Sequence, residues 1–214
     1  MKPLAIFYHC VISGGERAID PDYAINMMSH QMSALKESGL MAAASEFIVG
    51  VNGSEADAIA AACLCDDKAT VVHHGKDSMT EIPTFQMMHE WAKQHPGWYV
   101  LYHHTKGVSS RAADGWRNRM EESVIWGWED CVRWLDAGYD CCGCHWLTPA
   151  QFPGSVATPF FGGAFYWAKS DYLTTLPPLP EPTWANRYES EVWIGKSPRV
   201  PKIKDVRPGW PNPN

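Results

Sequence analysis

The chain has 214 residues, of which 45% are hydrophobic and 20% charged, and its formal net charge at pH 7 is −6. This length predicts a single globular domain with a sizeable core. The acidic balance argues against a nucleic-acid partner, because proteins that bind phosphate backbones usually carry a basic face, and no apolar run approaches the roughly 18 residues that a membrane helix needs.

The first half of the chain alternates between short apolar runs and amphipathic segments. Four strands are predicted at Leu4–Ile12, Phe47–Val51, Ala69–His73 and Trp98–His103, and three helices at Tyr23–Ser38, Glu55–Leu64 and Thr84–Gln94. Ser54 is expected to cap the second helix, with Asp57 three positions on. This order predicts an α/β fold with a parallel sheet, in which ligands bind at the carboxyl ends of the strands.

The second half shows a different pattern. Gly115–Leu135 predicts one long helix, because its apolar residues recur on one face. A short strand is expected at Tyr139–Gly143, a short helix from Ser170 and an amphipathic helix at Arg187–Ile194. Residues 196–214 hold five basic side chains, one acidic side chain and five prolines, which predicts an extended basic tail on the surface of the same domain.

The segment His103–Gly107 follows the fourth predicted strand directly, at the edge of the sheet where a ligand is expected. Lys106 offers a positive charge, Thr105 a hydroxyl donor and Gly107 room for close approach, and this combination suits a pyrophosphate. The spacing is not that of a P-loop. A surface turn with a solvated lysine would carry the same residues, so this motif alone leaves both interpretations open.

A segment rich in aromatic residues, Phe160–Tyr172, contains two adjacent glycines. These glycines allow the backbone to approach a flat ligand, although a buried strand with a bulge has the same pattern. The chain also holds eleven tryptophans, which offer flat apolar surfaces of the kind that sugar-binding sites use. Most of them are expected to pack in the core or at its rim.

A third segment, Arg187–Gly195, carries two glutamates in a predicted helix. One carboxylate can act as a general base for a sugar hydroxyl while the other pairs with Arg187. A solvated acidic helix face is the alternative interpretation, and the segment by itself favours it.

Taken in order, these motifs resemble a family of small bacterial and viral glycosyltransferase-like proteins. The resemblance spans residues 98–195. It rests on H-T-K-G at 104–107, W-R-x-x-M at 116–120, G-C-x-W at 143–146, G-x-F-x-W-A-x-S-x-Y at 163–172 and R-Y-x-x-E-x-W-I-G at 187–195. It implies a single-domain GT-A-like fold, with a Rossmann-like, mostly parallel sheet flanked by helices. The resemblance assigns residues 1–107 to a nucleotide-sugar-binding half and 108–195 to an acceptor half, followed by the basic Pro-rich tail at 196–214.

The resemblance also implies an activity. A glycosyltransferase of this type would move a hexosyl or deoxyhexosyl group from a UDP-, GDP- or dTDP-linked sugar to a hydroxyl acceptor such as a glycan, by direct displacement with inversion. Glu191 is the expected base, because it stands at the glutamate of R-Y-x-x-E-x-W, and Glu189 is the alternative. The donor is expected at Tyr8, His9, Cys10, Asn52, His104, Thr105, Lys106, Gly107 and Arg117. The acceptor is expected at Trp146, Gly162, Gly163, Phe165 and Trp167.

The metal site is where the sequence departs from that pattern. Enzymes with a GT-A fold usually carry Asp-x-Asp after the fourth strand, which holds Mn²⁺ or Mg²⁺ on the donor diphosphate. Here that place reads His103-His104-Thr105. Asp20-Pro21-Asp22 has the right letters, but it is expected to cap the first helix. Metal ligands are therefore not assigned, and Lys106 or the basic tail is expected to neutralise the leaving diphosphate, unless His104 or an acidic residue elsewhere binds a metal.

Seven cysteines, odd in number and preceded by no secretory leader, predict a cytoplasmic protein with reduced thiols. Cys141, Cys142 and Cys144 do not have the spacing of a zinc knuckle, and neighbouring strand residues face opposite ways, so buried structural thiols are expected. Two alternatives to the transferase remain open. One is a non-catalytic carbohydrate-binding module on the same fold, and the other is a zinc protein built on this Cys/His cluster.

Overall fold

A computed structural model describes residues 2–13, 19–75, 80–109, 113–150 and 158–208. Its main feature is a seven-stranded sheet in the order β3-β2-β1-β4-β8-β5-β9. Its strands are β1 Leu4–Val11, β2 Glu46–Asn52, β3 Ala69–Gly75, β4 Tyr99–His104, β5 Cys141–Gly143, β8 Tyr166–Lys169 and β9 Ile203–Asp205. Strand β8 is antiparallel to its neighbours β4 and β5, and the other pairs are parallel.

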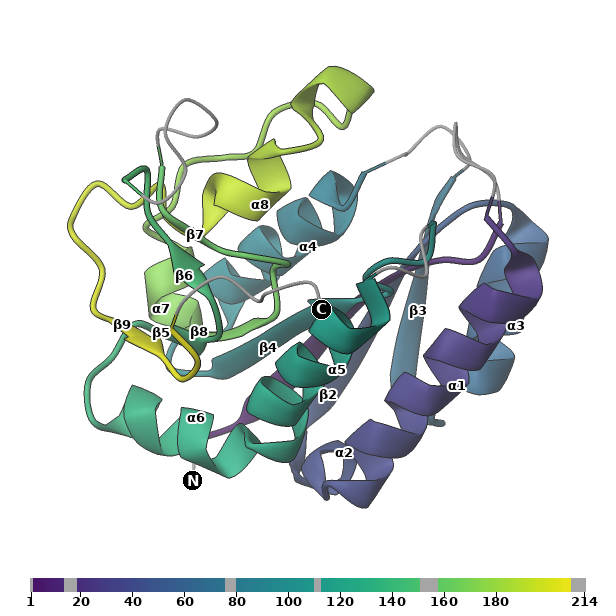
Figure 1. Ribbon diagram of the computed structural model, residues 1–214, viewed down its shortest axis with the longest axis horizontal. Coiled ribbons are helices and arrows are strands. Elements are labelled where there is room, and N and C mark those ends of the chain that lie inside the picture. The colour runs from purple at the N-terminus through teal and green to yellow at the C-terminus, as the bar shows by residue number, and fades with distance from the viewer. Residues whose placement is uncertain (1, 14–18, 76–79, 110–112, 151–157, 209–214) are drawn as a thin grey trace.

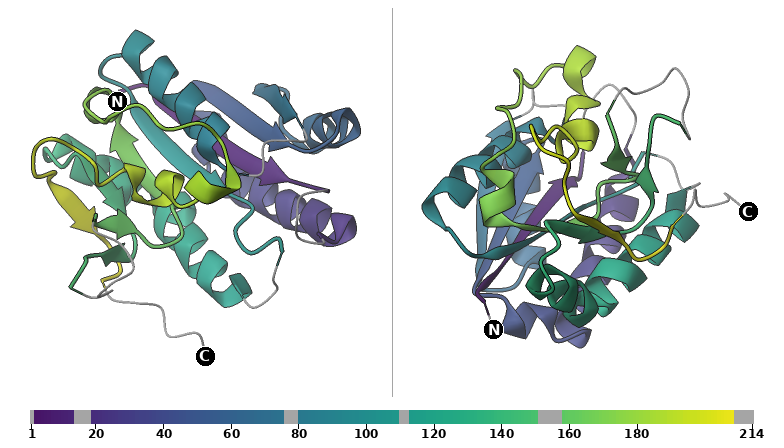
Figure 2. Two further views of the ribbon diagram at one scale, coloured as in Figure 1. Left: turned by 90° about the horizontal axis from the view of Figure 1, so that it is seen from above. Right: turned by 90° about the vertical axis from the view of Figure 1, so that its left-hand side faces the viewer.

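Helices cover both faces of this sheet, and each face buries its own apolar cluster (Figures 1 and 2). One layer contains α1 Pro21–Glu37, α2 Leu40–Ala43, α3 Glu55–Leu64, α5 Asp114–Glu121, the π-helix η2 Glu122–Trp126 and α6 Trp128–Asp136. The other contains α4 Ile82–Gln94, α7 Ser170–Leu173 and α8 Glu189–Trp193. Two short strands, β6 Trp146–Leu147 and β7 Phe160–Phe161, form a separate antiparallel pair. The predicted α/β class, with a mostly parallel sheet flanked by helices, is confirmed.

Helix starts follow the local signals in the sequence. Ser54 caps α3 in a capping box, because its hydroxyl accepts from the backbone N–H of Asp57 while the Asp57 carboxylate accepts from the backbone N–H of Ser54. The Asp20 carboxylate accepts from the backbone N–H groups of Asp22 and Tyr23. Asp20-Pro21-Asp22 is thus a helix cap, as predicted. Every helix in the described part of the chain is too short or too polar to cross a lipid bilayer.

The prediction of one long helix at Gly115–Leu135 is wrong. A π-turn ends α5, with the backbone N–H of Gly127 donating to the carbonyl of Glu122 at 3.1 Å, and α6 starts anew after it. A Cβ at Gly127 would lie 2.7 Å from the carbonyl oxygen of Ser123, so the tight turn needs a glycine there. Apolar residues on both sides of the turn, such as Met120 and Trp128, are buried, while Trp126 is 49% exposed.

Residues 196–208, the described part of the basic tail, contain one strand of the sheet. Strand β9 pairs in parallel with β5, and Asp140 holds the segment just before it. The Asp140 carboxylate accepts two hydrogen bonds of 2.7 Å from the Arg199 guanidinium and one of 2.8 Å from the backbone N–H of Lys202. At the other end of β9, the Asp205 carboxylate accepts from the backbone N–H groups of His145 and Trp146.

Replacing Asp140 with Ala should lower the free energy of unfolding by about 1–3 kcal/mol, because it removes these bonds from a mostly buried carboxylate. Burial would raise the pKa of Asp140, but the Arg199 and Lys202 hydrogen bonds outweigh burial and lower it. The ionised carboxylate therefore stabilises the fold above its unfolded-state pKa, and the stabilisation is lost as the pH falls. In urea unfolding, the difference in the free energy of unfolding between wild type and the Asp140 variant should be smaller at pH 3 than at pH 7. Glu129→Gln, on an exposed site, is the control and should leave the midpoint unchanged; an equal effect of both variants would contradict the role of Asp140.

Candidate functional site

Polar side chains from several strands meet the start of α4 at the carboxyl edge of the sheet. Nδ1 of His9, on β1, lies 2.8 Å from the Thr84 hydroxyl, and Nε2 of His74, on β3, lies 3.0 Å from it. The Asn52 amide, on β2, donates to the carbonyl of Thr80 at 2.8 Å. A side chain at Gly50 would collide with this cluster of polar side chains, because its Cβ would lie 2.1 Å from the Thr84 hydroxyl oxygen.

This part of the edge is polar but uncharged. Burial lowers the pKa of His9 to about 3 and that of His74 to about 4, so both imidazoles are neutral at pH 7. The amide oxygen of Asn52 is buried and accepts no hydrogen bond from the described residues. His9 and Asn52, both predicted donor-binding residues, thus lie together and leave an acceptor atom unused.

A pair formed by a glutamate and a histidine stands beside this cluster. Nδ1 of His104, at the end of β4, lies 2.8 Å from a carboxylate oxygen of Glu81, and the same oxygen accepts a 2.7 Å hydrogen bond from the Tyr102 hydroxyl. Burial alone would raise the pKa of Glu81, but the charge of His104 and its hydrogen bond outweigh burial and lower this pKa to about 2. Sequence analysis missed Glu81, because nothing in the local pattern before α4 marks it as the partner of a residue on β4.

Replacing Glu81 with Gln should lower the free energy of unfolding at pH 7 by about 1–3 kcal/mol, because it removes a charged partner from His104. The pKa of Glu81 is depressed, so the stabilisation is present above its unfolded-state pKa and is lost as the pH falls toward 2. Urea unfolding at pH 7 and pH 3 should show the gap between wild type and variant narrowing. Glu90→Gln, on the exposed side of the same helix, should change little at either pH; a gap that is independent of pH would contradict the assigned ion pair.

Glu191 lies at the same edge, although it comes from α8. Burial raises the pKa of Glu191, and the charges that act on its carboxylate are those of Lys106, Glu81, His104 and Arg187. The charge of Lys106, in the predicted phosphate-binding loop, thus lowers the pKa of the predicted base, against the larger effect of burial. Glu189 instead forms an ion pair with Lys196, whereas the pKa of Glu191 responds to the charge of Lys106.

Packing against α4 holds the short helix α8 in place (Figure 1). The Trp193 ring meets Phe85 edge-on at 5.6 Å and His89 at 5.4 Å, and its indole N–H donates to the carbonyl of Pro177 at 2.7 Å. The Tyr172 hydroxyl donates to the carbonyl of Ile194 at 2.6 Å, just after the helix. The aromatic residues of this motif thus hold the short helix that carries the glutamate.

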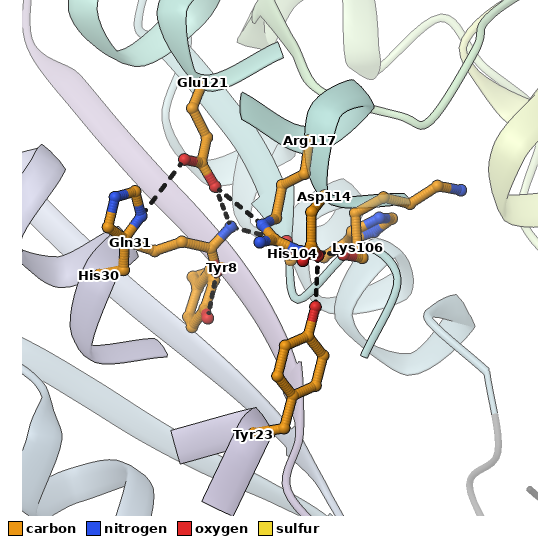
Figure 3. A network of polar contacts seen from close by, with 9 residues as sticks. All are labelled: Tyr8, Tyr23, His30, Gln31, His104, Lys106, Asp114, Arg117 and Glu121. Carbon is orange, nitrogen blue, oxygen red and sulfur yellow. Dashed lines mark hydrogen bonds and ion pairs between the residues drawn. The ribbon is translucent and has the colours of Figure 1, made fainter. Parts of the chain in front are cut away.

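A buried network on the other face of the sheet supports the loop after β4 (Figure 3). The Gln31 amide donates to the carbonyl of His104 at 3.1 Å and to the Glu121 carboxylate at 2.8 Å. The Arg117 guanidinium donates to the carbonyl of Lys106 at 3.0 Å. The hydroxyl of Tyr8, which was predicted to bind the donor, instead donates to Gln31 at 2.7 Å.

Arg117 is 7% exposed and is held by acidic partners. It donates to Asp114 at 2.9 Å and lies 3.6 Å from Glu121. The Lys106 side chain extends away from the network, and its ammonium lies 4.8 Å from the ring centre of Trp116 (Figure 3). The structure thus places Arg117 under the loop, where it holds the backbone, and leaves Lys106 as the cation of the loop.

The remaining residues of the loop shape its backbone. The backbone N–H of Thr105 donates to the carbonyl of His9 at 3.1 Å, and its hydroxyl accepts from the backbone N–H of Val11 at 3.3 Å. Gly107 has a φ of 79°, a conformation that side-chain-bearing residues rarely adopt. Hydrogen bonds of Thr105 therefore hold the loop against the end of β1.

Several predicted ligand residues lie in the core. Cys10, Phe165 and Trp167 are fully buried, and the Trp167 indole N–H donates to the carbonyl of Val124 at 2.8 Å. Trp146 is half-buried, with its ring 4.8 Å from that of Phe161. Packing accounts for these aromatic residues without a ligand.

The two adjacent glycines shape a turn that is also buried. A Cβ at Gly163 would lie 2.6 Å from the sulfur of Met120, and its φ is 87°. The backbone N–H of Gly162 donates to the carbonyl of His145 at 2.8 Å. Ala164 and His145 both have positive φ, at 54° and 61°, so backbone strain gathers at this turn. The glycines serve close packing against α5.

The residues at the Asp-x-Asp place do not fit a metal ion. His103 is fully buried, with its ring 4.6 Å from Tyr8 and 5.8 Å from Phe165, and His104 is paired with Glu81. Within the described ranges, no group of three or more His, Cys, Asp or Glu side chains is placed to hold a metal, and this includes the buried thiols of Cys141, Cys142 and Cys144. Lys106 and Arg187 are the cations near Glu191.

Comparison with known families gives one match over most of the chain. The family model named Domain of unknown function (DUF8361) matches residues 7–183. The chain belongs to this family. No curated protein matches the DUF8361 chain.

Solved structures of similar shape share little sequence with this DUF8361 protein. Rv0371c from Mycobacterium tuberculosis H37Rv has 12% identity and a TM-score of 0.49, over 98% of this chain and 91% of its own. A putative nucleotide-diphospho-sugar transferase from Desulfovibrio desulfuricans G20 has 10% identity and a TM-score of 0.45, over 97% and 81%. Glucosyl-3-phosphoglycerate synthase from Mycobacterium tuberculosis has 14% identity and a TM-score of 0.43, over 98% and 73%. All three scores lie below 0.5, so the chemistry of the DUF8361 chain must be argued from its own residues.

Proposed function

We propose that this chain is a glycosyltransferase, which moves a hexosyl or deoxyhexosyl group from a nucleotide sugar to a hydroxyl of a glycan acceptor. One observation carries the proposal. Glu191, a carboxylate with a raised pKa, lies in the field of Lys106 and His104 at the carboxyl end of β4. A base whose pKa is shifted toward neutrality, next to cations that can hold a diphosphate, suits displacement at a sugar carbon.

The reaction would be a direct displacement with inversion. Glu191 takes the proton of the acceptor hydroxyl while the hydroxyl oxygen bonds to the anomeric carbon, and the bond from that carbon to the diphosphate oxygen breaks. The Lys106 ammonium stabilises the negative charge that develops on the diphosphate. Glu81 engages Nδ1 of His104, which leaves the other ring nitrogen of His104 for a phosphate oxygen. No step is assigned to a metal ion.

The donor nucleoside would lie along the uncharged part of the edge, at His9 and Asn52. The unused amide oxygen of Asn52 suits an N–H or O–H of a base or ribose. Residues 1–107 would then form the donor half and residues 108–195 the acceptor half. The tail residues 203–205 complete the sheet as β9.

A panel of UDP-, GDP- and dTDP-linked sugars tests the proposal through release of the nucleoside diphosphate, with and without Mn²⁺. We expect release from one donor class, and Lys106→Met should weaken both donor binding and release. Lys68→Met, which removes a lysine far from this edge, is the matched control. If no donor binds and none releases a nucleoside diphosphate, with or without Mn²⁺, the proposed glycosyltransferase activity is contradicted. Glycan binding without nucleotide binding would indicate a carbohydrate-binding module instead.

A further inference from the structure

An aromatic cluster with an arginine at its centre stands directly before α8. The Arg187 guanidinium lies 4.6 Å from the ring centre of Trp184 and 4.2 Å from that of Tyr188. It donates to the carbonyl of Trp184 and to the Tyr188 hydroxyl, both at 3.1 Å. These stacking contacts and hydrogen bonds hold Tyr188 in one orientation. We call Trp184, Arg187 and Tyr188 the aromatic platform.

Tyr188 is the exposed member of the platform, while Trp184 and Arg187 are half-buried. Tyr188 is 55% exposed, whereas many of the aromatic side chains in the described segments are fully buried. What distinguishes Tyr188 is that the Arg187 guanidinium holds its ring while the side chain stays more than half exposed, so a ligand can reach it. The Arg187 guanidinium has five N–H groups and uses two of them in the bonds above, so it can also donate to hydroxyls of such a ligand.

The platform is also coupled to Glu191. Arg187 and Tyr188 have helical backbone angles and continue directly into α8, with the N–H of Val192 donating to the carbonyl of Tyr188 at 3.2 Å. Arg187 is therefore four positions, or about one helical pitch of 5.4 Å, from Glu191 on the same side. The charge of Arg187 lowers the pKa of Glu191, against the larger effect of burial.

We infer that the aromatic platform is the acceptor-binding site, and that it takes a pyranose of a glycan. The C–H face of the sugar ring would stack on Tyr188, its hydroxyls would accept from Arg187, and the next hydroxyl along would reach Glu191 one helical turn away. Stacking on a rigid aromatic ring requires no charge on the ligand. This kind of contact therefore suits a neutral sugar. The inference rests on the proposed transferase and names its acceptor site, in place of the buried Phe165 and Trp167.

Saturation-transfer NMR with methyl glycosides of glucose, galactose, mannose and N-acetylglucosamine tests the platform without a donor. We expect at least one glycoside to bind the wild-type protein through its ring C–H protons. Tyr188→Ala should weaken that binding by about tenfold or more, and Tyr188→Phe, which keeps the ring, should retain most of it. Trp126→Ala is the control, because Trp126 is equally exposed at 49% but lies on η2, away from α8.

Kinetics then separate the platform from the transferase. With a donor that is turned over, Tyr188→Ala should raise KM for the acceptor at least tenfold while hydrolytic release of nucleoside diphosphate stays near the wild-type rate. If the wild-type protein binds no glycoside, or if the Tyr188 and Trp126 variants lose glycoside binding equally, the platform is not the acceptor site, even if donor turnover is found. Tyr188-dependent glycoside binding without any donor turnover would uphold the platform as a sugar site and contradict the transferase.

Discussion

Replacing Glu191 with Gln should lower the rate of sugar transfer by about 10²–10⁴-fold, the range that a lost general base typically costs. Gln keeps the shape of the side chain but cannot take a proton from the acceptor hydroxyl. Donor binding should stay within about twofold of wild type, since Glu191 is not assigned to the diphosphate. The measurement is kcat for transfer beside the donor Kd from calorimetry.

Glu189→Gln is the matched control for this variant. It changes the same residue type two positions away on the same short helix, but the Glu189 carboxylate pairs with Lys196. Its kcat should stay near that of wild type. If the Glu191 variant keeps the wild-type kcat, the assignment of Glu191 as the general base is wrong. If both variants lose the same fraction of kcat, the loss is due to damage of α8.

The pH dependence provides a second readout of Glu191. Its pKa is raised by burial, so activity that needs the carboxylate should fall as the pH drops through this raised value. The same shift means that the fold favours the protonated form, so ionisation of Glu191 costs stability as the pH rises. Glu191→Gln should therefore be at least as stable as wild type at pH 7, which is the pattern expected of a residue kept for function.

Replacing Arg117 with Met should lower the free energy of unfolding by about 3–5 kcal/mol, the cost of leaving a buried charge without its partner. Arg117 is 7% exposed and serves Asp114, Glu121 and the carbonyl of Lys106. Its removal leaves the Glu121 carboxylate buried, and its remaining partners among the described residues are Gln31 and the exposed His30. Because the Lys106 carbonyl also loses a donor, donor binding should weaken in molecules that remain folded.

Two controls make this prediction specific. Burial raises the pKa of Glu121, so the neutral isostere in Glu121→Gln should cost clearly less than Arg117→Met. Arg133→Met removes an arginine whose side chain is 72% exposed and should change stability little. Urea unfolding at pH 7 gives all three values. An Arg117→Met effect no larger than that of Arg133→Met would contradict the supporting role of the network.

The alternation of strands and helices could be read from the sequence because it depends on local signals. Leu4–Val11 is a continuous apolar run, and Ser54 with Asp57 marks the start of α3. The break at Gly127 could not be read in this way, because the apolar residues on both sides of the π-turn still fit one helical face. The short strand β9 also escaped prediction, since pairing with β5 depends on a distant partner.

The site was only partly predictable for the same reason. Glu191 and Lys106 stand out as motif residues, and the charge of Lys106 lowers the pKa of Glu191. Glu81 pairs with His104, which lies on another element. No local sequence pattern indicates such a long-range pair. Phe165 and Trp167 were predicted to bind a ligand, but both are fully buried. The sequence pattern of an aromatic run is the same whether it lines a binding site or fills a core.

A crystal structure with the nucleoside diphosphate that binds most tightly among UDP, GDP and dTDP tests the central claim most directly. The account predicts the diphosphate beside Lys106 and His104 and the nucleoside along His9 and Asn52. It places Glu191 across the sugar position from the leaving oxygen, on the side from which the acceptor hydroxyl attacks. Density for the diphosphate elsewhere, such as in the hollow lined by Trp134, Lys204 and Arg207, would contradict it.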